Sequence, residues 1–164
     1  MPKNKISFFE ITNNEKNYIK KKFNNNFQLE FYKEPLTEEN ANLIKDTNVV
    51  STFIYSKINA KVISQAKKLK LITTRSTGYN HIDLKAAQKQ NISVAYVPYY
   101  GENTVAEHTF ALILSLSRNI HKAYVRTVQG NFSLDGLRGF DLKGKTIGVI
   151  GAGSIGVHVM KIAK

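Results

Sequence analysis

The sequence contains no cysteine and no tryptophan, and only three of its 164 residues are proline. Without cysteine the chain has neither a disulfide framework nor a cysteine-based metal site. No stretch approaches the roughly 20 apolar residues of a membrane-spanning helix, and the apolar run near the N-terminus is too short for a signal peptide. We therefore expect a protein of the reducing, cytoplasmic compartment that binds no metal and no membrane.

Acidic residues are also scarce, because 12 Asp and Glu face 24 Lys and Arg and leave a net charge of +12. Such a balance raises the question of nucleic-acid binding. The lysines are scattered, however, and the one consecutive run, Lys20 to Lys22, lies on an expected amphipathic helix with Tyr18, Ile19 and Phe23 on its apolar side. No zinc-finger, RRM or basic-zipper pattern accompanies them, which favours a solvated basic face over a nucleic-acid site.

The first hundred residues alternate between apolar runs and amphipathic segments. Runs rich in Ile, Val, Phe and Tyr predict strands, and some are nearly continuous, as in parallel strands covered on both faces. Thr37, Asn59 and Asp83 each precede a helical pattern as candidate N-caps. This rhythm predicts an α/β fold with a flavodoxin-like parallel sheet. The expected strands cover residues 5–11, 27–32, 48–55, 69–74 and 92–97.

The rhythm changes after Pro98, where a turn-rich connection leads into "TVAEHTFALILSLSRN", residues 104–119. Thr104 and Glu107 stand at the spacing of a capping box. The segment is apolar nearly all round, so we expect a helix that is buried on most sides. A short helix to about Gln129 and a long polar loop are expected to follow.

The segment "TIGVIGAGSIG", residues 146–156, ends on three glycines at the G-x-G-x-x-G spacing. It predicts a strand, a tight turn and a helix, which is the context that gives this otherwise weak motif its meaning. Gly151 permits the turn, Gly153 lets the backbone approach a pyrophosphate, and Gly156 lets the helix pack against the strand. The acidic residue expected about 20 positions later would fall beyond Lys164, so the motif does not distinguish NAD from NADP.

Three blocks in this order carry a resemblance to a known family: "ITTRSTGYNHIDLKAA", "VPYYGENTVAEHTFALILSLSRNIHKAY" and "GNFSLDGLRGFDLKGKTIGVIGAGSIG". They resemble the D-2-hydroxyacid dehydrogenases and, within them, the fermentative D-lactate dehydrogenases. The resemblance covers the chain from about residue 47. It implies a substrate domain over 1–101, followed over 102–164 by a crossover helix, a dimerisation arm and the first strand and helix of a truncated Rossmann domain.

The same resemblance implies where ligands bind. Thr77 and Gly78 match the family's loop whose backbone N–H groups hold the substrate carboxylate, and Tyr100 matches a tyrosine that closes over the substrate. The cofactor-binding positions implied are Thr104, Gly151, Gly153, Ser154, Ile155 and Gly156. This chain departs from the family in having Gly101 and Glu102 after that tyrosine, where Ser-Pro is frequent. Ser154 also replaces a residue that is often basic.

The family's catalytic Arg, Glu and His match no position within this chain, so no catalytic residue is assigned. His81, His108, His121 and His158 are interpreted as structural or surface residues. The function implied is that of an NAD-dependent enzyme interconverting pyruvate and D-lactate, as a homodimer. Hydroxypyruvate, phosphoglycerate or formate as the substrate, or a non-catalytic binding module of the same fold, remain alternatives. Nucleic-acid binding ranks last.

Overall fold

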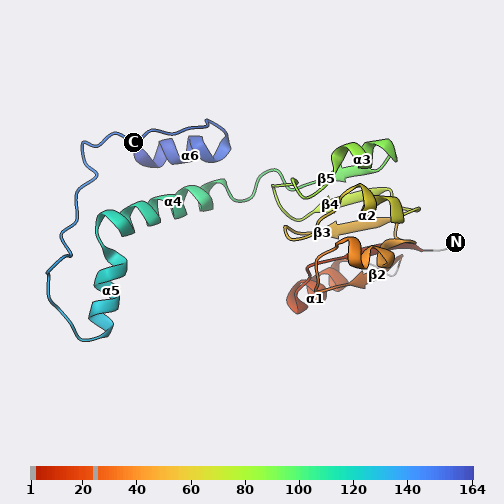
Figure 1. Cartoon of the computed structure of the whole chain (residues 1–164), viewed down its shortest axis with the longest axis horizontal. Coiled ribbons are helices and arrows are strands. Elements are labelled where there is room, and N and C mark those ends of the chain that lie inside the picture. Colours follow the sequence, from red (N-terminus) through yellow and green to blue (C-terminus); the bar gives the residue numbers. More distant parts are fainter. Residues whose placement is uncertain (1–2, 24–25) are drawn as a thin grey trace. The chain divides into compact units, whose positions relative to one another are not determined.

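The computed structural model describes residues 3–23 and 26–164, which divide into two compact units, residues 1–100 and residues 101–164. The first unit is built on a parallel five-stranded sheet with the order β2-β1-β3-β4-β5 (Figure 1). This order confirms the expected flavodoxin-like α/β fold. The strands are β1 (Asn4–Phe8), β2 (Phe27–Phe31), β3 (Val49–Thr52), β4 (Leu71–Thr74) and β5 (Ser93–Ala95).

The helices of the first unit begin where their capping residues predict. Asn59 Oδ1 accepts hydrogen bonds from the N–H groups of Lys61 and Val62, both at 3.1 Å, and Asp83 caps through Ala86 N–H at 2.9 Å. Each bond satisfies an N–H group that the first helical turn leaves free. The connecting helices are α1 (Asn13–Lys22), the 3-10 helix η1 (Glu38–Ile44), α2 (Ala60–Gln65) and α3 (Leu84–Lys89).

Two apolar clusters cover the two faces of this sheet. On one face, Ile19 of α1 packs with Ile6 and Phe8 of β1. The other face carries the larger cluster, which takes in residues of η1, α2 and α3 and includes the fully covered Val50 and Ile72. Strands β3 (VVST) and β4 (LITT) each begin with two apolar residues and end with two small hydroxyl residues, of which Ser51, Thr52 and Thr74 are buried. Lys20 to Lys22 are exposed on the last turn of α1, as a solvated basic face requires.

The second unit contains three helices and a long connection without regular structure. The helices are α4 (Glu102–Ser117), α5 (Ile120–Val128) and α6 (Ser154–Ala163), and α4 contacts α6. Gly139 lies so close to the end of α4 that a side-chain carbon there would come within 2.1 Å of the Ser117 carbonyl oxygen. The connection is thereby fixed to the corner between α4 and α5.

Within the described residues, no helix combines the length and apolarity needed to cross a membrane.

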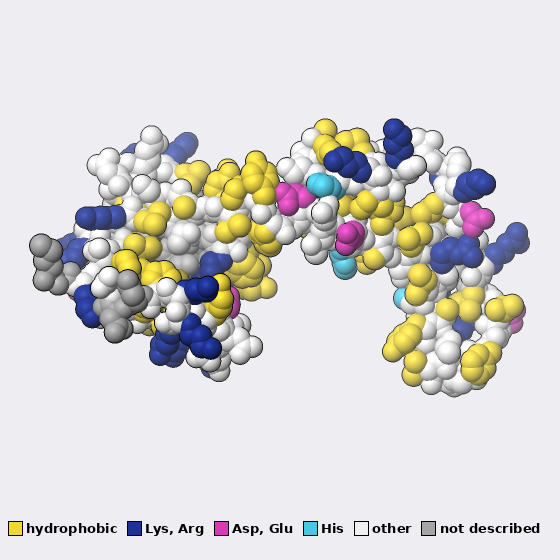
Figure 2. Space-filling model, turned by 180° about the vertical axis from the view of Figure 1, so that it is seen from behind, with side chains coloured by type: hydrophobic (Ala, Val, Ile, Leu, Met, Phe, Trp, Pro, Cys, Tyr) yellow, Lys and Arg dark blue, Asp and Glu magenta, His cyan; other side chains and the backbone are white. Residues whose placement is uncertain are grey.

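The prediction that α4 is buried on most sides is wrong for this chain. Among its residues only Ala106 and Ser117 are buried, while Leu116 is 68% exposed. Figure 2 shows apolar side chains on the surface of this unit, and α5 and α6 contribute to them. The helix is apolar nearly all round, but burial needs a covering surface, and the described residues of this unit supply little of one.

Two local predictions in the second unit also fail. Helix α4 begins at Glu102 with Gly101 as its N-cap, so Thr104 lies inside the first turn and does not form a capping box with Glu107. The N–H of Val105 already donates to the Gly101 carbonyl at 2.9 Å. Residues 146–150 form no strand, because a strand is defined by hydrogen bonds to a neighbouring strand and none lies beside this segment in the described chain.

Candidate functional site

The loop that follows β4 presents two free backbone donors. Thr77 and Gly78 are both exposed, directly beyond the carboxyl end of the strand. Among residues 3–23 and 26–164, no group accepts a hydrogen bond from the N–H of either residue. Consecutive free N–H groups of this kind can hold an anion such as a carboxylate.

Ser76 fixes the shape of this loop. Its side chain is buried, and its hydroxyl donates to the Gly78 carbonyl at 2.7 Å and lies 2.6 Å from the Thr74 hydroxyl. Its own carbonyl accepts the N–H of Val97 at 3.1 Å, which joins the loop to the segment after β5. The Ser76 carbonyl shares a peptide group with the Thr77 N–H, so the bond from Val97 fixes that peptide group, and the Ser76 hydroxyl holds the loop again at Gly78.

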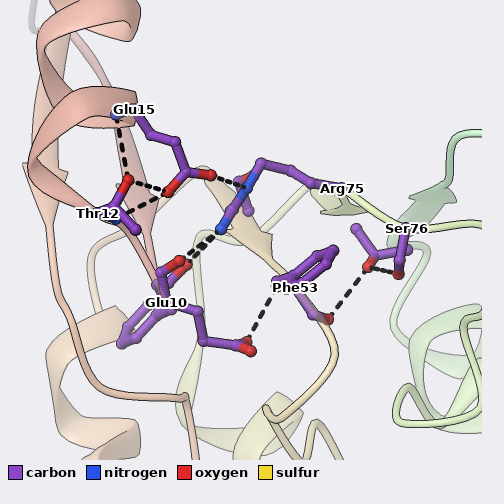
Figure 3. A network of polar contacts seen from close by, with 9 residues as sticks. Glu10, Thr12, Glu15, Phe53, Arg75 and Ser76 are labelled. Carbon is purple, nitrogen blue, oxygen red and sulfur yellow. Dashed lines mark hydrogen bonds and ion pairs between the residues drawn. The ribbon is translucent and has the colours of Figure 1, made fainter. Parts of the chain in front are cut away.

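A polar network joins the ends of β1, β3 and β4 beside this loop (Figure 3). Glu10 Oε2 accepts hydrogen bonds from the N–H of Phe53 at 3.0 Å and from the N–H and hydroxyl of Ser56, while Oε1 accepts the N–H of Tyr55 at 2.7 Å. Arg75 donates to the carbonyls of Phe9 and Glu10 at 3.0 and 2.9 Å. The network therefore ties together three strand ends at the edge where ligands bind in open α/β sheets.

The same network sets the charge states of its members. Burial alone would raise the pKa of Glu10, but hydrogen bonds from Ser56, Tyr55 and Phe53 outweigh it and hold that pKa below the ordinary value of 4.5. Burial lowers the pKa of Arg75, with Glu15 and Glu10 opposing the change. Both groups keep their charge near neutral pH, as a network of charge-assisted hydrogen bonds needs.

An open hollow of about 700 Å³ lies beside Glu10 at the switch point between β1 and β3. Phe53 and Tyr55 from the segment after β3 form part of its wall, and Lys33 contributes a positive charge. Tyr55 is 71% exposed. The hollow is thus accessible to small polar molecules at the same edge of the sheet.

Tyr100 is the last residue of the first unit, and its side chain is 62% exposed. Before it, Tyr96 packs on Tyr79 of the β4 loop, with ring centroids 5.0 Å apart. The structure therefore joins the segment leading to Tyr100 with the loop that holds Thr77 and Gly78. Thr104 belongs to the second unit and is exposed on the first turn of α4.

The glycine turn of the second unit has the backbone shape that the sequence predicts. Gly151 has a φ of +102°, which side chains of L residues rarely adopt, and a side-chain carbon on Gly156 would come within 2.0 Å of the Gly151 carbonyl oxygen. Gly153 has open space around it and is the N-cap of α6. No described residue accepts the N–H of Ser154 or Ile155, so this helix end offers free donors to an anion.

The histidines form no catalytic group with a carboxylate among the described residues. His81 lies 3.5 Å from the Thr52 hydroxyl, and burial lowers its pKa, while Glu10 opposes that change. A lowered pKa keeps the ring neutral near pH 7. The interpretation of His81 as a structural residue agrees with this environment.

Sequence reasoning missed Glu10, Arg75 and the Thr74–Ser76 pair. Glu10 and Arg75 are 65 positions apart and meet only because β1, β3 and β4 are neighbours in the sheet. One available signal was "RSTG" directly after an apolar strand, since a serine there can turn the chain through its hydroxyl. No local signal marks Glu10, which has a left-handed φ of 57°.

A family model and individual relatives match this chain to the same group of proteins. Residues 6–154 match the D-isomer specific 2-hydroxyacid dehydrogenase catalytic domain. A 2-hydroxyacid dehydrogenase homolog of Haemophilus influenzae is 42% identical over 98% of this chain and 49% of its own length. D-lactate dehydrogenase of Escherichia coli is 42% identical over 84% of this chain and 43% of its own length.

A solved structure gives the same result. D-lactate dehydrogenase of Aquifex aeolicus, in complex with NAD and lactic acid, matches with a TM-score of 0.85 and 33% identity, over 96% of this chain and 47% of its own. The chain thus spans about half the length of the relatives it matches. The sheet order, the loop after β4 and these matches agree, and the chain belongs to the D-isomer specific 2-hydroxyacid dehydrogenases, a family of oxidoreductases.

Proposed function

We propose that residues 1–100 are the substrate domain of an NAD-dependent D-lactate dehydrogenase, and that residues 101–164 begin its cofactor domain. The observation that carries the proposal is the pair of free N–H groups at Thr77 and Gly78, presented by a buried serine at the carboxyl edge of the sheet. Such a pair suits the carboxylate of a 2-oxoacid. The family membership supplies the reaction class.

In this proposal the two N–H groups bind the substrate carboxylate and orient C2 for reaction. Orientation of this kind can contribute several kcal/mol to a barrier reduction, because it removes rotational freedom before the reaction step. Tyr100 shields the substrate from water on the exposed side of the loop. Bound NADH would supply the hydride that reduces the C2 carbonyl to the alcohol.

The glycine turn fits a dinucleotide. The absence of a side chain at Gly156 permits the close contact with Gly151, and the open space at Gly153 lets a pyrophosphate approach the N–H groups of Ser154 and Ile155. The Ser154 hydroxyl adds a donor that is weaker than a basic side chain. Preference for NAD over NADP is supported by the relative that binds NAD.

Pyruvate is the proposed substrate because a relative 42% identical to this chain is a D-lactate dehydrogenase. Hydroxypyruvate, phosphoglycerate and formate are the competing substrates, and they differ from pyruvate in size or charge beyond the shared carboxylate chemistry. A test must therefore compare all four.

We also propose that the protein works as a homodimer. The exposed apolar side chains of α4 and α5, such as Leu116 and Tyr124, would be covered by the same surface of a second copy. Large apolar patches of this kind usually mark an interface.

The test is a chimera in which residues 1–164 are joined to the part of Escherichia coli D-lactate dehydrogenase that this chain does not match. We expect the folded chimera to oxidise NADH with pyruvate faster than with hydroxypyruvate, and to reduce NAD with D-lactate faster than with phosphoglycerate or formate. Gly78→Pro removes one N–H and should lower kcat/KM for pyruvate by about 10- to 100-fold, the effect of a hydrogen bond to a charged group. Gly78→Ala keeps the N–H, has open space for its methyl group, and is the control.

Equal effects of Gly78→Pro and Gly78→Ala on kcat/KM would contradict a carboxylate site at this loop. A preference of the chimera for another of the four substrates would contradict pyruvate while leaving the family reaction intact. Circular dichroism of each variant confirms that the chimera is folded before rates are compared.

A further inference from the structure

The carboxylate of Glu10 is connected to the Gly78 loop by a continuous series of hydrogen bonds. Phe53 donates its N–H to Glu10 Oε2 at 3.0 Å, and the carbonyl of the same residue accepts the Thr74 hydroxyl at 3.2 Å. The Thr74 hydroxyl lies 2.6 Å from that of Ser76, which donates to the Gly78 carbonyl at 2.7 Å. Figure 3 shows Glu10, Phe53 and Ser76 lying in this order.

The middle of this series is buried, which makes its geometry strict. Thr74 and Ser76 are 0% and 3% exposed, so their hydroxyls are shielded from bulk solvent. The hydroxyls of Thr74 and Ser76 have two protons for three contacts, which are Thr74 with the Phe53 carbonyl, Thr74 with Ser76, and Ser76 with the Gly78 carbonyl. If Thr74 donates to the Phe53 carbonyl, the Ser76 proton is shared between Thr74 Oγ1 and the Gly78 carbonyl, as in a three-centre bond. A shift of the Phe53 backbone that moves its carbonyl therefore changes the hydrogen bond that holds Gly78.

The backbone of Glu10 has an unusual conformation that hydrogen bonds from neighbouring segments stabilise. Its φ of 57° lies in the left-handed region, which is unfavourable for a residue with a side chain. It persists because Arg75 and Glu34 bind its backbone from two sides, through the Glu10 carbonyl at 2.9 Å and the Glu10 N–H at 3.2 Å. This conformation places the carboxylate where it accepts four hydrogen bonds from residues 53–56.

We propose that Glu10 is a positioning residue, which orients the Thr77–Gly78 anion loop through the backbone N–H and carbonyl of Phe53 and the Thr74–Ser76 hydroxyl pair. Glu10 itself touches no substrate in this scheme. Its role for catalysis rests on the proposed function, since it is the loop that would hold the carboxylate. The connection from Glu10 to Gly78 can be tested without any ligand, so the two proposals can fail separately.

Other charged groups near Glu10 must be distinguished from it in such a test. Arg75 at the end of β4 and Glu15 of α1 belong to the same network, and Lys33 lines the same hollow. His81 also interacts electrostatically with Glu10. Histidine and carboxylate titrations are separated in pH, and Glu15 has no hydrogen bond to residues 53–56, so variants of Glu10 resolve its contribution.

The experiment is a pH titration of the whole ¹⁵N-labelled chain followed by NMR. We expect the amide signals of Phe53, Tyr55, Ser56 and Gly78 to share one step with a midpoint below 4.5, the ordinary carboxyl value. Glu10→Gln should abolish this step at all four amides. Ser76→Ala should abolish it at Gly78 alone and leave it at the other three.

Glu30→Gln is the matched control, because Glu30 is also half-buried with a lowered pKa but contacts Lys5, Ser7 and Tyr32 instead. It should leave all four steps in place. In the chimera, Glu10→Gln and Ser76→Ala should raise the KM for pyruvate by several-fold with less change in kcat, and Glu30→Gln should not.

A Gly78 step that survives in Glu10→Gln, or in the less invasive Ser76→Ala, would overturn the positioning role. Absence of any step at Gly78 in the unsubstituted chain would also overturn it. A chimera without 2-oxoacid activity would contradict the proposed function and leave the NMR result to decide on Glu10.

Discussion

Residues 1–100 and residues 101–164 differ in what covers their apolar side chains. In the first unit, Val50, Ile63 and Ile72 are fully buried. In the second unit the buried apolar residues are Ala106 and Val159, while other apolar side chains such as Leu116 and Val128 are nearly 70% exposed. Both units carry clear helical patterns, so the difference lies in packing and not in local structure. A helix pattern predicts an element, and its burial depends on what packs against it.

The two units differ in how far their stability depends on a covering partner. A five-stranded sheet with helices on both faces closes its own core. The second unit has three helices, of which α4 contacts the other two, together with a long connection and no sheet in the described chain. Fully burying one Leu or Ile side chain contributes roughly 1.5–3 kcal/mol, which is large against the 5–15 kcal/mol of a typical domain. We expect the first unit to be stable by itself and the second to need a covering partner.

The largest expected effect concerns activity. The 164-residue chain should show no NADH oxidation with pyruvate above the uncatalysed rate, in contrast to the chimera. The resemblance to the family assigns no catalytic Arg, Glu or His within the chain, so nothing would polarise the carbonyl or supply the proton. Calorimetry should likewise show NAD binding weaker than micromolar, since one helix end provides only part of a dinucleotide site. Turnover by a preparation free of other dehydrogenases would contradict this expectation.

A matched pair of truncations tests the packing difference. Ile63→Ala removes a fully buried side chain of the first unit and should lower the free energy of unfolding by about 2–5 kcal/mol. Leu116→Ala removes a side chain that is 68% exposed and should change that free energy by less than about 0.5 kcal/mol in the monomer. Denaturant unfolding followed by NMR gives both values, with signals of the first unit for Ile63→Ala and signals of the second unit for Leu116→Ala. A similar loss of unfolding free energy in the two variants would contradict the difference in burial between the two units.

The sequence predicts most of the first unit because its signals are local and agree with one another. The strands around Val50 and Ile72 are short β-branched runs, and Asn59 and Asp83 mark helix starts that the structure confirms. Thr12 and Glu15 form a capping box that sequence reasoning overlooked, although its spacing is the usual one.

The rest could not be predicted because it depends on distant partners. Thr104 and Glu107 have the spacing of a capping box. Because the N-cap of α4 is Gly101, both residues lie inside the helix, where they do not cap its N-terminus. The run from Thr146 to Ile150 has strand composition, but a strand also needs a neighbour. In the candidate site, the anion loop at Thr77 and Gly78 was identified through the family resemblance. The Glu10 network was not, since it assembles from three strands.

A second matched pair compares two glycines of the dinucleotide turn. Gly156→Ala places a methyl carbon within 2.0 Å of the Gly151 carbonyl oxygen, so the start of α6 must shift, at a cost of about 1–3 kcal/mol in this unit. Gly153→Ala meets no atom within 4 Å and should cost less than about 1 kcal/mol, the usual range for replacing an N-cap. NMR signals of residues 154–163 should change widely in the first variant and little in the second. Equal changes would contradict the assigned roles of these glycines.

The smallest expected effect is on acid stability of the first unit. The pKa of Glu10 is below 4.5 in the folded chain, so its carboxylate stabilises the fold fully above the unfolded value, and this contribution is lost as the pH falls through the folded pKa. Glu10→Gln should therefore show a shallower loss of stability between neutral pH and the acid range than the unsubstituted chain. Thermal unfolding at a series of pH values measures this. Parallel curves for the two proteins would exclude a lowered pKa for Glu10.

The most direct test of the difference between the units is residue-resolved hydrogen exchange of the whole chain, with its oligomeric state measured by sedimentation in the same buffer. We expect strands β1, β3 and β4 to be protected at every concentration. Residues 103–164 should be protected where the chain is a dimer or larger, and should exchange rapidly where dilution makes it a monomer. A monomer with residues 103–164 as fully protected as the strands would show that the second unit is stable without a partner, and would contradict the account.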